Sequence, residues 1–305
     1  MLSVIITSFK EPNTIGKCIE SIADSNYSQI SKPFEILQVS PDEQTLKAGK
    51  STAEKLGLSD TEYRQIVDPC KGKPVALKMA LERAKGDIVI LTDGDTYFDK
   101  KAVKELCKPF ENDKIGGVSG RPVANDSKDS QMGYYGNLLA DSAHHRRSDV
   151  MKHVLNTDYY ISENKFFPMS GYIMAIRNIN FDIPKDVLSD DAYISYVLRN
   201  KGYEIGYAPK ARCFVKYPKT LKDYFKQKVR SIGGFIQLEQ YEIFKRDKQS
   251  RSFGIELKYF LFVLKYPENL REIFWSIIFF PIRLWAWIRI FWERRVVKKD
   301  FKKTW

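Results

Sequence analysis

One pair of acidic residues stands where it could bind a divalent metal ion. Asp93 and Asp95, separated by Gly94, directly follow the apolar run 88–91, which is typical of a strand covered on both faces. Two carboxylates joined by one glycine can point at a single cation in a tight turn, and Mg²⁺ usually completes its shell with water and phosphate oxygens. The motif therefore predicts a phosphorylated ligand, with a solvated acidic turn as the alternative.

A second acidic pair, Asp190 and Asp191, follows Ser189. Serine before two acids is also an ordinary start of a helix, because the hydroxyl caps free backbone N–H groups and the acids favour the positive end of the helix dipole. Taken alone, this pair indicates helix capping. It becomes a catalytic candidate only together with other motifs.

The elements that must position these acids alternate between strands and helices. Those expected in the first hundred residues are strand 2–6, a helix opening near 11–12, strand 34–39, helix 44–56, strand 63–67, helix 73–84 and strand 87–91. This alternation predicts a parallel sheet with helices on both faces. Such sheets bind ligands at the carboxyl ends of their strands, which points to residues 7–11, 40–43 and 93–96.

The chain after residue 115 has a less regular pattern. Segments 118–120 and 174–176 are expected to be strands, 190–199 a helix and 202–215 a hairpin. Beyond Thr220 the pattern predicts helices.

Five short motifs occur in order along the chain. They are Val4–Glu11 (VIITSFKE), Lys71–Leu77 (KGKPVAL), Ile90–Asp95 (ILTDGD), Ser189–Asp191 (SDD) and Gln227–Arg230 (QKVR). Their order and spacing resemble those of the inverting glycosyltransferases of family 2, and most of all the branch that includes cellulose and hyaluronan synthases. The resemblance covers residues 1–235 and implies an α/β GT-A fold with a mostly parallel sheet.

The resemblance also implies a site for a nucleotide-diphosphate sugar. The residues expected to contact this donor are Thr7, Glu11, Asp42, Lys73, Asp93 and Gln227. Asp95, together with Asp93, would hold Mg²⁺ or Mn²⁺ at the diphosphate.

Further residues are implied for the transfer itself. Asp191 would be the general base, with Asp190 beside it, and Arg230 would close over the diphosphate and the acceptor. Ser170 and Gly171 would line the acceptor site, where the glycine permits close approach.

The sequence departs from the family pattern in several places. Ser231 stands where the synthases have a tryptophan, Lys78 stands where an asparagine is common, and Asp42 lies in an unusual context. The chain also lacks the set of membrane-spanning helices through which those synthases export a polymer. This favours the transfer of one or a few sugars over processive synthesis.

The chemistry of inversion explains why two acidic sites are needed. One base must take a proton from the acceptor hydroxyl, and positive charge must stabilise the departing diphosphate. A carboxylate with an ordinary pKa of ~4 is a feeble base for an alcohol, so proton transfer has to accompany formation of the glycosidic bond. A metal ion, Arg230 and Lys73 are the candidates that stabilise the leaving group.

The excess of positive over negative charge lies entirely in the last third of the chain. The net charge is +12, yet residues 201–305 hold 24 Lys+Arg and 10 Asp+Glu, which leaves a net −2 on residues 1–200. This charge alternates with large apolar blocks, and no nucleic-acid-binding motif occurs. It therefore predicts an anionic membrane surface as the partner rather than a nucleic acid.

Residues 273–292 form a strongly aromatic segment that is long enough, as a helix, to cross a bilayer. Arg283 near its centre, together with Arg289 and Pro281, argues against a span. The segment is therefore expected to lie in the membrane interface rather than cross it.

The pattern around this segment supports the same expectation. Glu272, Ser276, Arg283 and Arg294 fall in one polar stripe, and a second apolar stretch covers 253–266. Basic residues in 294–303 would attract anionic lipid. A helical cap packed on the catalytic domain, or a dimer interface, is the alternative.

The chain is thus predicted to have a catalytic domain, 1–235, and a basic, aromatic membrane-associating region, 236–305. It would act at the cytoplasmic side of the cell membrane on a lipid-linked saccharide or a glycan. A subunit of a processive synthase and a non-catalytic sugar-nucleotide-binding protein are the alternatives. The segment 144–147 (HHRR) is interpreted as a solvated or acceptor-facing basic patch.

Overall fold

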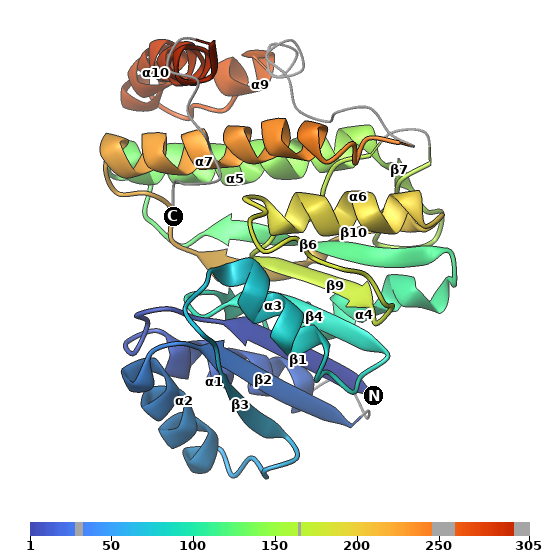
Figure 1. The fold of residues 1–305 in the computed structure, drawn as a ribbon. Coiled ribbons are helices and arrows are strands. Elements are labelled where there is room, and N and C mark those ends of the chain that lie inside the picture. Colours follow the sequence, from blue (N-terminus) through green and yellow to red (C-terminus); the bar gives the residue numbers. More distant parts are fainter. Residues whose placement is uncertain (28–32, 164–165, 246–259, 296–305) are drawn as a thin grey trace.

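One mixed sheet forms the centre of the protein (Figure 1). The computed structural model describes residues 1–27, 33–163, 166–245 and 260–295. Within these residues the strands follow the order β3-β2-β1-β4-β9-β6-β10-β8-β7, with β5 paired to β10. The strands are β1 (Leu2–Thr7), β2 (Phe34–Ser40), β3 (Tyr63–Val67), β4 (Ile88–Asp93), β5 (Tyr97–Phe98), β6 (Ile115–Ala124), β7 (Lys152–His153), β8 (Tyr160–Ile161), β9 (Ile173–Arg177) and β10 (Glu204–Val215).

Helices cover both faces of this sheet, as the alternating sequence pattern predicts. They are α1 (Ile15–Tyr27), α2 (Glu43–Lys55), α3 (Lys73–Leu81), α4 (Ala102–Cys107), the 3₁₀ helix η1 (Lys108–Glu111), α5 (Gln131–Val150), α6 (Asp190–Asn200), α7 (Leu221–Gln240), α9 (Phe260–Lys265) and α10 (Leu270–Arg295).

The two halves of the sheet differ in strand direction. β1 pairs in parallel with β2 and β4, and β2 pairs in parallel with β3, because α1, α2 and α3 return the chain between them. In the second half, β9 runs antiparallel to both of its neighbours, β4 and β6. The sheet is therefore parallel where the sequence pattern is regular and mixed beyond it.

Two local expectations are wrong. The hairpin expected at 202–215 is the single strand β10, which pairs with β6 and loses register between Tyr207 and Arg212. Pro209 lies in this irregular stretch, and proline has no N–H for a ladder bond. The first helix begins at Ile15 rather than near 11–12, because Lys10 adopts a positive φ of 57° and residues 12–14 form a turn.

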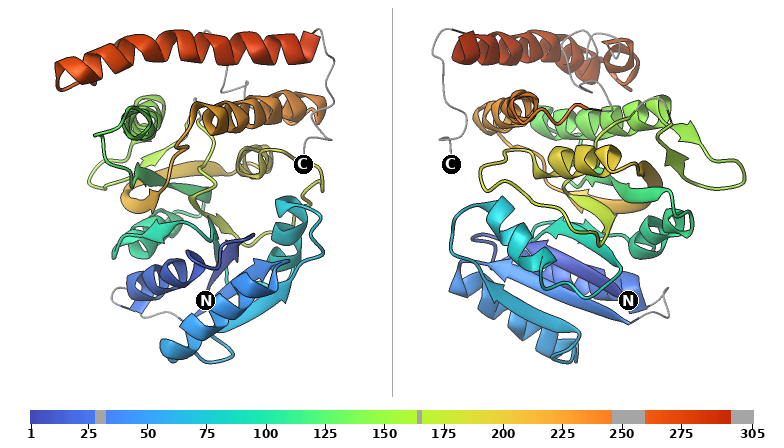
Figure 2. Two further views of the ribbon diagram at one scale, coloured as in Figure 1. Left: turned by 90° about the vertical axis from the view of Figure 1, so that its left-hand side faces the viewer. Right: turned by 45° about the vertical axis from the view of Figure 1, so that its right-hand side comes forward.

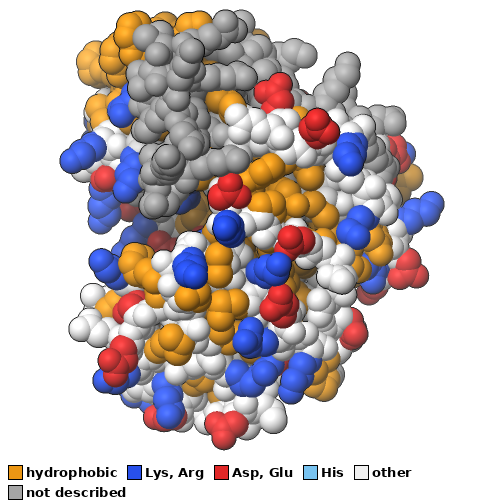
Figure 3. Space-filling view, in the orientation of Figure 1, with side chains coloured by type: hydrophobic (Ala, Val, Ile, Leu, Met, Phe, Trp, Pro, Cys, Tyr) orange, Lys and Arg blue, Asp and Glu red, His pale blue; other side chains and the backbone are white. Residues whose placement is uncertain are grey.

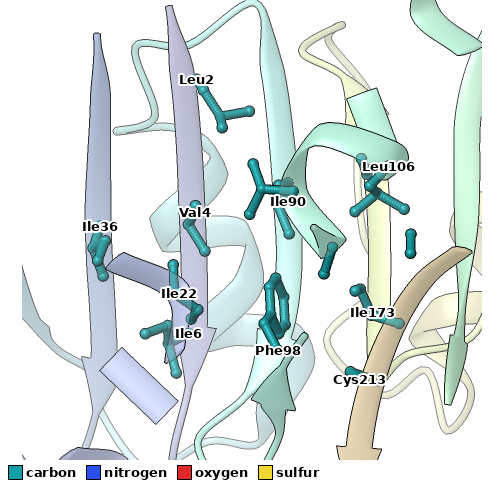
Figure 4. Close-up of a cluster of buried hydrophobic side chains, with 14 of the residues drawn as sticks. Leu2, Val4, Ile6, Ile22, Ile36, Ile90, Phe98, Leu106, Ile173 and Cys213 are labelled. Carbon is teal, nitrogen blue, oxygen red and sulfur yellow. The ribbon is translucent and has the colours of Figure 1, made fainter. Parts of the chain in front are cut away.

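The core lies on both faces of the sheet because successive strand residues point in opposite directions. Val4 and Ile6 pack with α1 and α4 in one cluster (Figure 4), whereas Ile5 packs in the other cluster with α3 and α6. Both clusters hold the carboxyl ends of β1 and β4 in a fixed register, which puts Thr7 beside Asp93.

Helices α5 and α7 cover the second half of the sheet, and α10 packs across both on the side away from the sheet (Figures 1 and 2). Helix α7 runs without a break across residue 235, where the sequence suggests a division of the chain into two parts. That division stays a prediction.

Helix α10 packs its polar side inwards. Glu272 and Ser276 are only 3% and 1% exposed. The Ser276 hydroxyl lies 2.6 Å from the Tyr134 hydroxyl, and Arg283 Nη1 donates to the Tyr224 hydroxyl at 3.1 Å. The predicted polar stripe is therefore buried against α5 and α7.

The opposite side of α10 is exposed and mostly apolar, although Arg271 and Arg289 of this helix are exposed as well. Its exposed large apolar side chains, which we call the outer face of α10, are Leu270, Ile273, Phe274, Ile277, Leu284, Trp285, Ile288, Phe291 and Trp292. Figure 3 shows hydrophobic side chains gathered at the end of the molecule where α10 lies. Three parts of the predicted membrane-associating region lie outside the described residues. They are the Arg294 side chain, the basic residues from 296 onwards, and residues 253–259 of the second apolar stretch.

Of the helices in the described ranges, none combines the length and the apolarity needed to cross a bilayer.

Candidate active site

The carboxyl ends of β1 and β4 bring together two of the predicted donor-site residues. Thr7 and Asp93 are partners in the parallel pairing of these strands. The Thr7 hydroxyl donates to Asp93 Oδ1 at 3.0 Å. One carboxylate oxygen of Asp93 is therefore held by the neighbouring strand.

Lys73 connects this strand edge to the start of α6. It is the first residue of α3, and its Nζ lies 2.6 Å from Asp93 Oδ1 and 3.5 Å from Asp190 Oδ2. Burial disfavours the ammonium, but the charges of Asp190 and Asp93 outweigh it and raise the pKa of Lys73 well above its usual range. Lys73 is therefore a fixed positive charge between two acidic motifs that lie far apart in the sequence.

Asp191 is held in place by contacts on three sides. Its Oδ1 accepts hydrogen bonds from the Ser189 hydroxyl at 3.0 Å and from its own neighbour Ala192 N at 2.7 Å, and its Oδ2 accepts from Gly171 N at 3.2 Å. Burial and the charge of Asp190 raise the pKa of Asp191. The bond to Gly171 reaches the loop before β9, so Asp191 does more than cap its own helix.

Asp95 and Glu11 lie next to Asp93. The pKa of Asp95 is raised, first by burial and second by the charge of Asp93. The pKa of Glu11 is raised to about 8, first by burial and then by the charges of Asp95 and Asp93. Glu11 Oε2 is buried and accepts no hydrogen bond within the described part of the chain. A β-carbon on Gly94 would lie 2.3 Å from that oxygen, so only glycine lets the acidic turn approach Glu11.

Asp42 has a structural role in the turn after β2. It caps α2 by accepting from Thr45 N at 3.0 Å, and it accepts from Lys10 N at 2.7 Å. Burial acts to raise its pKa, but the hydrogen bonds from Thr45 and Lys10 outweigh burial and lower it. Asp42 thereby ties the turn after β1 to the start of α2.

A cavity of about 700 Å³ joins most of these residues. The predicted site residues in its wall are Lys73, Asp93, Ser170, Gly171, Asp190, Asp191, Gln227 and Arg230. The predicted residues outside its described wall are Thr7, Glu11, Asp42 and Asp95. Residues of β4, α3, the loop before β9, α6 and α7 therefore line one cavity.

Two tyrosines in this wall, Tyr172 and Tyr217, were not predicted from the sequence. The Tyr172 hydroxyl accepts a hydrogen bond from Gln227 Nε2 at 3.2 Å. Burial and the charge of Asp93 raise its pKa to about 12, so it stays protonated. Its position directly after Gly171 is the one sequence signal that could have indicated it.

The two arginines of the basic segment 144–147 are buried, so the prediction of a solvated patch is wrong for them. Arg146 and Arg147 line the cavity at 9% and 6% exposure, and both guanidinium groups lie over the ring of Phe167, at 4.9 and 4.8 Å. His144 Nδ1 lies 2.7 Å from the hydroxyl of Tyr207, whose ring Arg147 also approaches.

The residues that depart from the family pattern also have defined places. Ser231 lines the cavity, and so does Trp287, which α10 contributes. Lys78 is on the surface, where it pairs with Asp182.

The acidic residues fit a divalent cation that is completed by a ligand. Within the described residues, no group of three or more His, Cys, Asp or Glu side chains could hold a metal ion alone. Asp95 and Glu11 are buried beside Asp93, and burial first and the neighbouring carboxylates second raise the pKa of both. Carboxylates plus diphosphate oxygens form a donor set that Mg²⁺ and Mn²⁺ accept.

Comparison with known families gives a match over most of the chain. The sequence model described as "Glycosyltransferase like family 2" matches residues 1–234. The chain is 28% identical over 191 residues to the poly-beta-1,6-N-acetyl-D-glucosamine synthase of Staphylococcus aureus strain COL, covering 59% of this chain and 43% of the relative. It is 23% identical over 252 residues to an N-acetylglucosaminyltransferase of Azorhizobium caulinodans, covering 75% and 58%. The chain therefore spans about half the length of these curated relatives.

Solved structures share the fold. The mannosyltransferase PcManGT of Pyrobaculum calidifontis, in complex with GDP-Man and Mn²⁺, superposes with a TM-score of 0.59 at 16% identity, over 96% of this chain and 88% of that one. GalNAc-T7 with UDP, GalNAc and Mn²⁺ gives a TM-score of 0.52 at 15% identity, over 71% and 43%. These likenesses confirm the GT-A fold expected from the sequence.

Proposed function

Since the chain belongs to the glycosyltransferase-like family 2 and is a glycosyltransferase, we propose that it moves a sugar, with inversion, from a nucleotide-diphosphate sugar to a glycan or a lipid-linked saccharide. The observation that carries this proposal is the position of Lys73, which lies 2.6 Å from Asp93 and 3.5 Å from Asp190. Two acidic motifs about a hundred residues apart therefore face one cavity, as donor and acceptor sites must.

Asp191 is the proposed general base. In the transfer, the acceptor oxygen bonds to the anomeric carbon, the bond from that carbon to the diphosphate breaks, and the diphosphate leaves with the electron pair. The acceptor proton passes to Asp191. Its raised pKa makes the carboxylate a stronger base than a solvated aspartate, and the bonds from Ser189, Ala192 and Gly171 hold it still.

Asp95 and Asp93 are the proposed ligands of Mg²⁺ or Mn²⁺. When bound, the metal ion would neutralise negative charge on the departing diphosphate. Burial of Asp95 beside Asp93 leaves these carboxylates without enough positive charge, which supports a cation there. Both solved neighbours were crystallised with Mn²⁺.

The remaining predicted residues divide between the two substrates. Thr7, Glu11 and Asp42 stand at the strand ends and would shape the nucleotide side. Arg230 and Gln227 approach the cavity from α7 and would face the diphosphate, where a guanidinium and an amide donate hydrogen bonds. Ser170 and Gly171 would face the acceptor beside Asp191.

We also propose that α10 lies on the cytoplasmic surface of the cell membrane. Its polar stripe is buried in the protein, whereas the outer face is mostly apolar, with Arg289 exposed near Trp285 in the sequence, and is wide enough to dip into the lipid interface. The net positive charge of residues 201–305 would add attraction to anionic lipid. The alternative is that a second copy of the chain covers the outer face in a dimer.

A second candidate function follows from the relatives. The Staphylococcus aureus protein is described as a synthase of an N-acetylglucosamine polymer. This supports a role for the chain as a subunit of a polymerising enzyme, and it makes N-acetylglucosamine the first donor sugar to test.

The test is release of nucleotide diphosphate with Mn²⁺ from UDP- and GDP-linked N-acetylglucosamine, N-acetylgalactosamine and mannose. Replacing Asp191 by Asn should lower kcat by about 10²–10⁴-fold and leave the donor Kd nearly unchanged. Asp95→Ala should instead weaken Mn²⁺-dependent donor binding. Asp182→Asn, on the surface at 73% exposure, is the matched control and should behave as the wild type. Equal turnover in all of these proteins, each shown to be folded, would refute the proposal.

A further inference from the structure

The cavity extends beyond the residues that the transfer requires. Away from Asp191, its wall continues between α5, α7 and α10. The apolar side chains there, which we call the apolar arm, are Leu138, Leu139, Val263, Phe279, Leu284 and Trp287. A sugar acceptor alone has no use for such a surface, because its hydroxyls need polar partners.

Arg147 lies where the apolar arm meets the catalytic acids. It is near enough to Asp191 for that charge to affect its guanidinium, and Leu139 precedes it by about two turns on the same helix. The guanidinium donates from Nη2 to the carbonyl oxygen of Pro168 at 3.3 Å and lies over the Phe167 ring.

Among the described residues, the guanidinium of Arg147 has no direct partner of opposite charge, although Asp191 is near. Within the described residues it forms no ion pair with a carboxylate, and its buried Nε donates no hydrogen bond. Burial lowers its pKa, but a guanidinium remains charged in proteins. A buried charge is costly unless a partner of opposite sign comes to it, so this side chain is suited to receive an anion from the cavity.

We propose that Arg147 binds a phosphate group of the acceptor and that the apolar arm binds the hydrocarbon chain attached to that phosphate. The acceptor is then an amphiphilic lipid phosphate, a narrower class than the glycan or lipid-linked saccharide of the proposed function, on which this inference rests. The planar guanidinium matches phosphate geometry. Leu284 belongs to both the apolar arm and the outer face of α10, so a hydrocarbon chain leaving the arm reaches the surface assigned to the membrane.

The test is direct binding by calorimetry to the full chain, without donor or metal. Dodecyl phosphate carries both features, dodecanol carries only the chain, and inorganic phosphate carries only the anion; the two amphiphiles are used below their micelle concentrations. We expect dodecyl phosphate to bind at least about tenfold more tightly than either of the others, because a charge-assisted hydrogen bond adds to the burial of the chain. Equal affinity for dodecanol would overturn the phosphate contact. Equal affinity for inorganic phosphate would overturn the role of the apolar arm.

Variants of Arg147 identify the group responsible. Arg147→Gln should remove the preference for dodecyl phosphate over dodecanol, and Arg147→Lys should restore part of it. Arg83→Gln is the matched control, since Arg83 is an exposed arginine that also donates to a backbone carbonyl, that of Met79. A preference that survives in Arg147→Gln would show that another group binds the phosphate, and the proposal would be wrong.

A second variant keeps the test decisive if the Arg147 proteins do not fold. Ala143 lines the cavity one turn before Arg147. Ala143→Phe should fill the space and weaken both amphiphiles while leaving inorganic phosphate unchanged. Amphiphile binding that is unaffected by this change would place the ligand elsewhere, for example on the outer face of α10. None of these measurements involves sugar transfer, so their failure is distinct from failure of the proposed chemistry.

Discussion

The cavity lies between an acidic region at the strand ends, around Asp93 and Glu11, and a basic region on α5, around Arg147 and His144; we call these the acidic end and the basic end. At the acidic end, burial and the charge of Asp95 raise the pKa of Glu11 to about 8. At the basic end, burial and the charge of Arg121 lower the pKa of His144 to about 4. Burial thus pushes each group towards its neutral form, and a neighbour of its own sign pushes it further.

The two proposed substrates would match this contrast. The acidic end, around Asp93 and Asp95, would be balanced by a metal ion that accompanies the diphosphate of the proposed donor. The basic end, around Arg147, would be balanced by a negative charge on the proposed acceptor. Lys73 and Asp191 lie between the two ends, where the sugar would change partners.

The largest expected effect comes from removing the charge that joins the acidic motifs. Lys73→Met removes the ammonium group that lies near both Asp93 and Asp190. Because preorganised charge contributes strongly to catalysis, turnover should fall at least about a hundredfold. The Lys73 side chain is 34% exposed to the cavity, so solvent screening should limit the loss of unfolding free energy, measured in urea, to about 1 kcal/mol.

Lys78→Met is the matched control for that variant. Lys78 also pairs with one aspartate, Asp182, but on the surface. It should change neither turnover nor stability by much. Equal activity of the two variants would mean that the charge of Lys73 does not organise the acidic end.

A smaller effect should follow from changing the outer face of α10. The double variant Phe274→Glu with Ile277→Glu places two charges on the outer face of α10. Binding to vesicles of anionic phosphatidylglycerol, measured by sedimentation, should fall at least about tenfold, because apolar burial and electrostatic attraction are both reduced. Leu155→Glu, at a loop residue that is 84% exposed, is the control.

The same pair of variants decides between the membrane and a second copy of the chain. Unchanged sedimentation would contradict the membrane surface. If light scattering instead shows that the double variant converts a dimer to a monomer, the outer face of α10 is a dimer interface.

The smallest expected effect concerns acid stability at the basic end. In the unfolded chain His144 takes up a proton near its ordinary pKa of 6.5, but in the fold only near pH 4. Between these values the unfolded state binds more protons, so this histidine makes the protein less stable as the pH falls. His144→Gln should flatten the decline of melting temperature from pH 6.5 to 4, whereas His153→Gln, at an exposed site, should not. The same decline in both variants would show that His144 is not shielded from protonation.

Much of the secondary structure of the first hundred residues, and helix α6 beyond them, could be predicted because the signals there are local. Apolar runs of strand length, the glycine between Asp93 and Asp95, and the serine before Asp190 each act on a few neighbouring residues. The predicted strands and the helices α2, α3 and α6 accordingly appear close to their expected limits. The antiparallel direction of β9 could not be predicted, since strand direction depends on how the connections run through space.

The candidate site was predictable in its residue types but not in its arrangement. Local pattern could not show that Asp42 is used up in capping α2, nor that Arg147 is buried, because both depend on neighbours from other elements. The two tyrosines were missed for the same reason. A tyrosine in a sequence carries no sign of the cavity that it will face.

Helix α10 separates the two kinds of information most clearly. Residue spacing alone predicts that this helix has a polar stripe and an apolar side. Which of the two faces the protein is known only from the packing of α10 against α5 and α7. A hydroxyl or a guanidinium is satisfied equally well by water or by buried tyrosine hydroxyls, as Ser276 and Arg283 are here, so periodicity cannot tell the inside of an amphipathic helix from its outside.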